Sequence, residues 1–168
     1  YYTHLRHGRN YMRRNDETID PKGHATDLFS DWSIDYLKQR KRDRQKFFLY
    51  LAYNAPHVPI QPPDEWVQKI RQRLPSLDPK RAKIAALIEH LDDSIGRVLR
   101  ALKENGQSES TLVLFTSDNG GQVSAGGTCG PWRGAKEDMF EGGTRVPMCA
   151  SWPGRIPAGS QSDQIALA

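Results

Sequence analysis

Cysteine is scarce in this chain of 168 residues, which contains only Cys129 and Cys149. Two cysteines are too few for a disulfide framework or a zinc cluster, so neither kind of stabilised domain is indicated. The sequence also lacks a run of about 18 apolar residues, the length that a membrane-spanning helix needs. Its first residues have no apolar stretch and therefore do not resemble a signal peptide.

The two ends of the chain lack the pattern of natural termini. The sequence starts without Met, in a polar stretch rich in His and Arg, and stops at Ala168 in what resembles the start of a structural element. We therefore expect an internal piece of a longer protein. The missing targeting signal then says nothing about where that protein is found.

The composition is that of an ordinary globular domain, with 37% hydrophobic residues, 26% charged residues and a formal net charge of +4. A chain of this length can form one domain with a core but not two comfortable ones. Its mildly basic balance suits an anionic substrate or surface without identifying either.

Apolar residues at helical spacing predict three helices. The first begins at Thr26, a suitable N-cap, and runs into the basic stretch 38–46. Cations at a helix C-terminus complement the helix dipole, and we favour this interpretation over a polyanion site. A short helix is expected over 64–73. A long helix over 79–105 carries an apolar stripe and ends at Gly106.

Three continuous apolar runs, 47–52, 111–116 and 146–152, predict strands. Runs without alternation are typical of parallel strands that are covered on both faces. The order of helices and strands therefore predicts an α/β layer fold with a mostly parallel sheet. Ligands of such sheets bind beyond the carboxyl ends of the strands. His57 and the pair Asp118–Asn119 both follow such ends, so we expect them to meet in space.

Four residues could carry chemistry. Asp118 and Asn119 offer a carboxylate and an amide oxygen, which suit a hard cation such as calcium or magnesium, although a strand-ending turn uses the same residues. Lys136, in a glycine-rich loop, could bind an anion as a point charge or be an ordinary exposed lysine. His57, between two prolines, could be catalytic or a hydrogen-bonded surface residue.

Three motifs in this order resemble those of the sulfatase family, which belongs to the alkaline phosphatase superfamily. They are Ala55-Pro56-His57-Val58-Pro59, Thr116-Ser117-Asp118-Asn119-Gly120-Gly121, and Arg133-Gly134-x-Lys136 followed by Glu141-Gly142-Gly143-x-Arg145-Val146-Pro147. The helix segment 88–96 also resembles the family pattern. The resemblance extends from about His24 to Pro157.

The resemblance implies an alkaline phosphatase-like fold of three layers, with a mostly parallel central sheet flanked by helices, and a sulfuric ester hydrolase. Asp118 and Asn119 would be metal ligands for Ca²⁺, with Mg²⁺ as the second choice. Lys136 would neutralise the sulfate group. His57 would hydrogen-bond the sulfate ester and help to protonate the leaving oxygen. The substrate would be a sulfate ester, in the commonest case on a carbohydrate, and no nucleic-acid partner is expected.

Residues 1–168 would then be part of a single catalytic domain. The first aspartate metal ligands, the formylglycine nucleophile and a Gly-Lys-Trp-His segment would lie upstream of the chain, and a C-terminal subdomain downstream. We therefore expect the isolated chain to be inactive. The family also implies an extracytoplasmic location: periplasmic, secreted or lysosomal.

Two other groups of residues contain possible catalytic side chains, and we predict no catalytic role for either group. Cys129 opens a Cys-x-Pro-x-Arg string like that of the formylglycine cysteine, but it lies downstream of Asp118, and a short motif depends on its context. We therefore interpret the match as coincidence. Cys149 is expected to be buried in a strand. His90 and the pair Asp92–Asp93 are expected to be structural, since adjacent helix residues point in different directions.

Two alternatives remain open at the level of sequence. A phosphoester or phosphonate hydrolase of the same superfamily more often has Asp-His where this chain has Asp118–Asn119, because imidazole favours transition metals. A non-catalytic homologue could bind an anion or a carbohydrate. The identity of the upstream nucleophile would distinguish all three.

Overall fold

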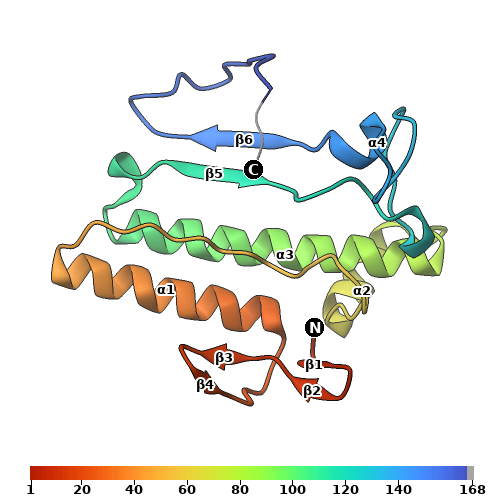
Figure 1. Cartoon of the computed structure of the whole chain (residues 1–168), viewed down its shortest axis with the longest axis horizontal. Coiled ribbons are helices and arrows are strands. Elements are labelled where there is room, and N and C mark those ends of the chain that lie inside the picture. The colour runs from red at the N-terminus through yellow and green to blue at the C-terminus, as the bar shows by residue number, and fades with distance from the viewer. Residues whose placement is uncertain (166–168) are drawn as a thin grey trace. The chain divides into compact units, whose positions relative to one another are not determined.

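The computed structural model describes residues 1–165, which form two compact units, Tyr1–Ala101 (unit 1) and the described residues from Leu102 onward (unit 2) (Figure 1). Each unit is described by itself. Unit 1 contains two small antiparallel strand pairs, β1 (Leu5–Arg6) with β2 (Arg9–Asn10) and β3 (Arg13–Arg14) with β4 (Glu17–Thr18). It also contains the helices α1 (Ala25–Asp43), α2 (Asp64–Arg73) and α3 (Pro79–Glu104), and the last residues of α3 fall in unit 2. Unit 2 contains two short 3-10 helices, η1 (Ser108–Ser110) and η2 (Val123–Ala125), the strands β5 (Val113–Thr116) and β6 (Met148–Ser151), and α4 (Glu141–Thr144).

Helix α1 has the predicted extent but a different N-cap. Thr26, the predicted cap, lies inside the first turn, and its N–H donates to Nδ1 of His24 over 3.2 Å. His24 is thus the capping residue, because its ring acceptor reaches a free amide of the first turn. Basic residues occupy the last turn, as expected from the helix dipole, and Arg44 ends the helix in a left-handed conformation.

Helices α2 and α3 match the predictions of 64–73 and 79–105 to within one residue. They pack through a small apolar cluster in which Ile70 of α2 meets Ala82 and Ala86 of α3. Farther along α3, Leu87 is fully buried. Burial of a side chain the size of Leu or Ile contributes about 1.5–3 kcal/mol. The apolar stripe predicted for this helix is buried only in part, since Ile84, Leu87 and Leu102 are buried whereas Ile88 and Leu99 are 46% and 43% exposed.

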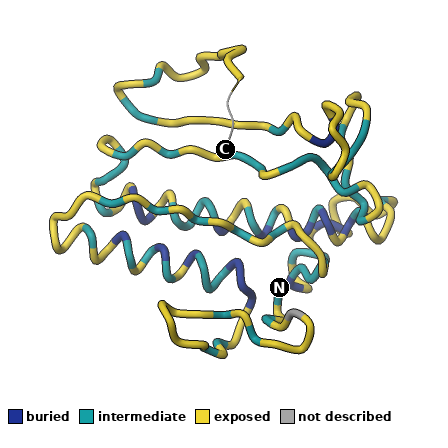
Figure 2. Tube along the Cα trace, in the orientation of Figure 1, coloured by how far each residue is buried: buried dark blue, intermediate teal, exposed yellow. Residues whose placement is uncertain are grey.

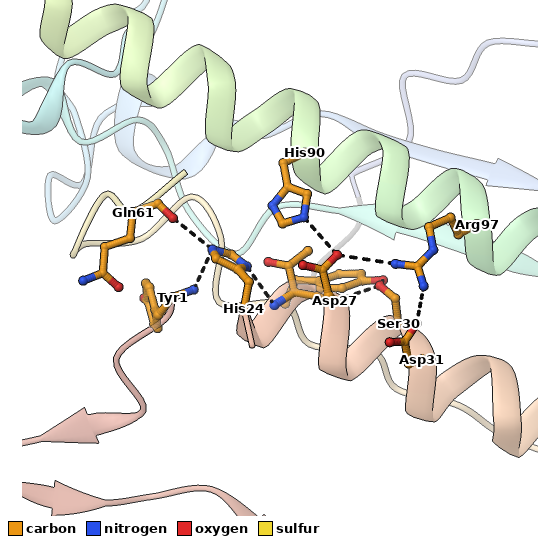
Figure 3. A network of polar contacts seen from close by, with 10 residues as sticks. Tyr1, His24, Asp27, Ser30, Asp31, Gln61, His90 and Arg97 are labelled. Carbon is orange, nitrogen blue, oxygen red and sulfur yellow. Dashed lines mark hydrogen bonds and ion pairs between the residues drawn. The ribbon is translucent and has the colours of Figure 1, made fainter. Parts of the chain in front are cut away.

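A polar network joins α1 to α3 (Figure 3). Asp27 of α1 accepts from Nε2 of His90 over 3.0 Å and from Arg97 over 3.4 Å. Arg97 also forms an ion pair with Asp31, one turn farther along α1. The partners advance together along both helices, so α1 and α3 run in the same direction. His90 is 4% exposed, which agrees with its predicted structural role.

The predicted strand 47–52 is wrong. This segment is extended and alternates between half-buried and exposed residues, but no strand pairs with it among the residues that the structure describes (Figure 2). Phe48 and Tyr50 are 88% and 82% exposed. A strand is defined by its ladder, and an apolar run alone supplies no partner for one.

The predicted parallel sheet is also wrong for the described residues. The two strands of unit 2 pair with each other in an antiparallel ladder, with Val113 opposite Ser151 and Thr116 opposite Met148. All strand pairs in the described part of the chain are antiparallel and two-stranded. The predicted burial fails too, since Leu114 is 56% exposed and Cys149 is exposed. Among the described residues, no further strand extends this ladder. No helix in residues 1–165 is long and apolar enough to cross a membrane.

Unit 2 depends on glycines that let backbone segments touch. A Cβ on Gly120 would lie 1.8 Å from the carbonyl oxygen of Gly142, and one on Gly142 would lie 2.1 Å from that of Gly134. A Cβ on Gly143 would lie 2.1 Å from the oxygen of Asp138. Gly142 and Gly143 are both buried. The loop 133–143 can therefore reach the end of β5 only because these positions carry no side chain.

The first prediction concerns Gly120. Its replacement by Ala should lower the free energy of unfolding by about 3 kcal/mol or more, because backbone rather than a movable side chain opposes the new methyl group. The matched control is Gly154→Ala, where the new Cβ has open space and meets only the left-handed φ of +72°, a cost of about 1–2 kcal/mol. Urea unfolding of both variants checks this, and equal losses would contradict it.

A second prediction concerns pH. Burial, the largest cause, together with neighbouring positive charge lowers the pKa of His24 from 6.5 to about 4. His24 thus binds a proton below about pH 6.5 in the unfolded chain but only below about pH 4 in the folded chain. Stability should therefore fall as the pH drops through this window, by no more than about 3 kcal/mol.

The His24→Asn variant tests this, because Asn can still cap α1 but does not titrate. Urea unfolding at pH 7 and pH 4.5 should show a smaller loss of stability in the variant than in the parent. His7→Asn is the matched control at an exposed histidine. If the parent and His24→Asn lose the same stability, the assignment to His24 is wrong.

Candidate functional site

The turn after β5 presents Asp118 and Asn119 at the end of a strand, as predicted. Ser117 Oγ donates to the carbonyl oxygen of Asn119 over 3.1 Å and holds the turn closed. Asp118 is exposed and Asn119 is half-buried. A local hydrogen bond thus fixes the backbone, while the carboxylate remains accessible to solvent and ligands.

The donor set of this turn fits a hard cation. Asn119 Nδ2 donates to the carbonyl oxygen of Gly120 over 2.9 Å. This bond orients the amide, and Oδ1 has no hydrogen-bond partner in the part of the chain that the structure describes. An oriented amide oxygen beside a carboxylate matches the oxygen ligands of calcium and magnesium. Two ligands do not complete such a shell, so further ligands are needed from outside this turn.

Lys136 lies in a tight turn of the glycine-rich loop. The N–H of Asp138 donates to the oxygen of Ala135 over 2.9 Å, and Oδ2 of Asp138 accepts from the N–H of Ala135 over 2.8 Å. Glu137, the next residue, adopts a φ of +79°, which is uncommon for a residue with a side chain. Lys136 is half-buried, and its ammonium is in none of the ion pairs formed within residues 1–165. The turn therefore fixes the backbone of Lys136 and leaves its ammonium available to an anion.

Backbone hydrogen bonds bring the two turns together. Lys136 donates its N–H to the oxygen of Gly121 over 3.1 Å, two residues beyond Asn119. Gly120 donates its N–H to the oxygen of Gly143 over 2.9 Å. Unit 2 thus places Asp118, Asn119 and Lys136 in one loop cluster, although 16 residues separate Asn119 from Lys136 in the sequence.

Two arginines support the loop around Lys136, and the sequence analysis missed this role. The guanidinium of Arg133 lies over Phe140 at 3.7 Å from the ring centroid. Arg145 lies over Trp132 at 4.3 Å and forms an ion pair with Glu141 over 3.0 Å. Such contacts contribute about 0.5–1 kcal/mol at exposed positions. Both arginines belong to the third motif, which is the feature that could have identified them.

Cys129 is half-buried, and its Sγ lies 3.5 Å from the oxygen of Gly121, the carbonyl that also accepts from Lys136. The thiol therefore helps to close the cluster. This contact explains the residue without a nucleophilic role, and the interpretation of its motif as coincidence stays a prediction.

His57 lies in unit 1, in the exposed loop after the extended segment 47–52. Its N–H donates to the oxygen of Asn54 over 2.9 Å. Its Nδ1 lies 2.7 Å from the oxygen of Val58, and because a carbonyl only accepts, Nδ1 carries the proton. Nε2 is then the ring atom left for a ligand. The meeting of His57 with the unit 2 residues stays a prediction.

A second cluster was not identified from the sequence. His24, Asp27 and His90 each place a ligand atom within 4.8 Å of the others, which is close enough for a metal ion. Nδ1 of His24 accepts from the N–H of Thr26, and its Nε2 lies 3.1 Å from the oxygen of Gln61 and 2.9 Å from the backbone nitrogen of Tyr1. Nε2 of His90 lies 3.0 Å from the carboxylate of Asp27. Hydrogen bonds within the protein thus engage all three residues, and we interpret the cluster as a hydrogen-bond network.

Comparison with known proteins agrees with the motifs. A family model described as Sulfatase matches residues 1–166. N-acetylgalactosamine-6-sulfatase of Canis lupus familiaris is 33% identical over 148 residues, which are 86% of this chain and 27% of the relative. A sulfatase of Formosa agariphila is 38% identical over 147 residues, 82% of this chain and 26% of the relative.

Solved structures give the same result. The crystal structure of Ps i-CgsB in complex with k-i-k-neocarrahexaose matches with a TM-score of 0.81 at 36% identity, covering 86% of this chain and 32% of that chain. The chain thus spans about a quarter to a third of the length of these relatives. With a family model that matches nearly its whole length, this chain belongs to the sulfatase family.

Proposed function

We propose that the full-length protein hydrolyses a sulfate ester and that this chain supplies one side of its active site. The observation that carries the proposal is the loop cluster of unit 2, in which a turn with a carboxylate and an oriented amide oxygen is bonded to a turn with a lysine. A sulfate ester needs both, since negative charge on the sulfuryl oxygens must be stabilised during transfer.

In this proposal Asp118 and Asn119 are two of the ligands of a calcium ion. Bound calcium would act as a Lewis acid on a sulfuryl oxygen. The choice of calcium over a transition metal rests on the donor atoms, because this turn offers oxygen and no imidazole. Further ligands and the formylglycine nucleophile would come from the sequence upstream of the chain.

Lys136 would bind the sulfate group as a fixed point charge. Its half-buried position and the tight turn around it reduce the freedom that a lysine side chain must lose on binding. Its ammonium would draw the sulfuryl group toward the cation turn. Binding by Lys136 and by the metal would thus orient the ester, and this accounts for much of the catalytic power of such sites.

His57 would act on the leaving oxygen. The carbonyl of Val58 holds the proton on Nδ1, so a protonated ring would present its second proton on Nε2. A general acid of this kind contributes roughly 10²–10⁴-fold to the rate when the leaving group is poor. The role requires His57 to approach the unit 2 cluster in the full-length protein.

The substrate class proposed is a sulfated carbohydrate. Support comes from two of the matched proteins, since one is an N-acetylgalactosamine-6-sulfatase and the structure of the other was determined with a neocarrahexaose. An alcohol leaving group on a sugar is poor, which fits a histidine acid. We also propose an extracytoplasmic location, periplasmic, secreted or lysosomal, on the basis of the family.

A third prediction distinguishes the role of Asp118 in metal binding from the role of Lys136 in sulfate binding. In the full-length protein, Asp118→Ala should raise the calcium concentration required for half-maximal turnover of an aryl sulfate. Lys136→Ala should leave that concentration unchanged but lower kcat/KM by about 10²–10³-fold. Steady-state assays over a calcium titration measure both effects. Asp92→Ala and Lys103→Ala, at exposed positions of α3, are the matched controls. Near-native turnover in both site variants would refute the site assignment.

A fourth prediction concerns His57. The His57→Gln variant should lose about 10²–10⁴-fold in kcat on phenyl sulfate, whose leaving phenolate needs protonation. On 4-nitrophenyl sulfate, whose leaving group is stable as an anion, the loss should be much smaller. Equal losses on both substrates would show that His57 binds sulfate and does not act as the acid.

A further inference from the structure

The loop that carries His57 is tied down at both ends to one helix of unit 1. At its start, Tyr53 Oη lies 2.7 Å from Oγ of Ser30 in α1. At its end, the carbonyl oxygen of Gln61 lies 3.1 Å from Nε2 of His24, the cap of α1. Figure 3 shows Ser30 on α1 and the contact between His24 and Gln61. Between these two anchors, His57 and its neighbour Val58 are exposed.

The donor in the Tyr53 anchor follows from the other bond of Ser30. Ser30 is fully buried and donates its single hydroxyl proton to the oxygen of Thr26 over 2.8 Å, so Tyr53 must donate to Ser30. Burial raises the pKa of the Tyr53 phenol, which keeps this donor protonated. Nδ1 of His24 accepts from the N–H of Thr26, and its Nε2 lies 3.1 Å from the oxygen of Gln61 and 2.9 Å from the backbone nitrogen of Tyr1.

The anchors themselves are held in place. The side chain of Gln61 accepts from the N–H groups of Tyr2 and Thr3 and donates to Oγ1 of Thr3 over 3.0 Å. Helix α1 is joined to α3 through Asp27 and its partners on that helix. A loop whose ends are fixed to a helix pair has few conformations left for its tip.

We infer that Ser30 and Tyr53 on one side, and His24 on the other, are positioning residues for His57, an inference that rests on the role of His57 proposed above. None of the three touches the substrate in this account. They act by holding Nε2 of His57 at one place relative to the leaving oxygen. A displacement of about 1 Å at a reacting group can lower the rate about 10²-fold.

The test uses the full-length protein, two substrates and a double-mutant cycle. Tyr53→Phe removes only the hydroxyl, and Ser30→Ala removes its acceptor. Each should lower kcat on phenyl sulfate by about 5- to 100-fold while KM stays unchanged. On 4-nitrophenyl sulfate, which does not need the acid, neither variant should matter. In a His57→Gln background, Tyr53→Phe should have no further effect on phenyl sulfate.

Tyr50→Phe is the matched control, since Tyr50 lies in the same segment and is 82% exposed. This variant should behave as the parent on both substrates. A merely structural role for Tyr53 would lower activity on both substrates alike and would persist in the His57→Gln background, and either result overturns the inference. If His57→Gln itself shows no preference between the substrates, the proposed role of His57 fails, and the inference fails with it.

Discussion

The candidate site depends on a close contact between two backbone segments, the end of β5 and the loop 133–143. Gly120 donates to Gly143 at a distance that leaves no space for a Cβ. Through this contact, the carboxylate and amide of one turn come to share a cluster with the lysine of another. A contact made by side chains would hold the two turns less rigidly, because each side chain adds rotatable bonds. The glycines of the second and third motifs are therefore needed for the polar residues beside them to lie in one cluster.

Unit 1 fixes its contribution by different means. The loop that carries His57 is anchored by hydrogen bonds to two buried residues, Ser30 of α1 and its capping residue His24. Such networks are specific because a missing partner leaves a buried polar group unsatisfied. The same network makes unit 1 sensitive to acid, since the ring of His24 cannot accept a second proton without losing its bond to Thr26. Positioning of the loop and resistance to low pH are thus linked through one histidine.

The sequence was informative where a pattern is local. The stripe of α3 identified part of its buried face, including Leu87 but not the exposed Ile88, and the motif order identified the family and the turn that carries Asp118. Patterns that depend on a distant partner failed. The apolar run 47–52 indicated a strand, but nothing in it specified a neighbour to pair with. The cap of α1 was assigned to Thr26 because its type is common there, whereas the ring of His24 takes the bond. Spacing also could not show that Gly120 would touch Gly142.

In the proposed site, the turn at Asp118 and the turn at Lys136 bring two positive charges, a calcium ion and an ammonium group, to one sulfate group. A crystal structure of the full-length protein grown with calcium and inorganic sulfate would show this arrangement. Calcium is expected at about 2.3–2.6 Å from the Asp118 carboxylate and from Oδ1 of Asn119, with a sulfate oxygen bound by the Lys136 ammonium. A calcium ion bound without either residue, or a sulfate held away from Lys136, would contradict the proposed arrangement.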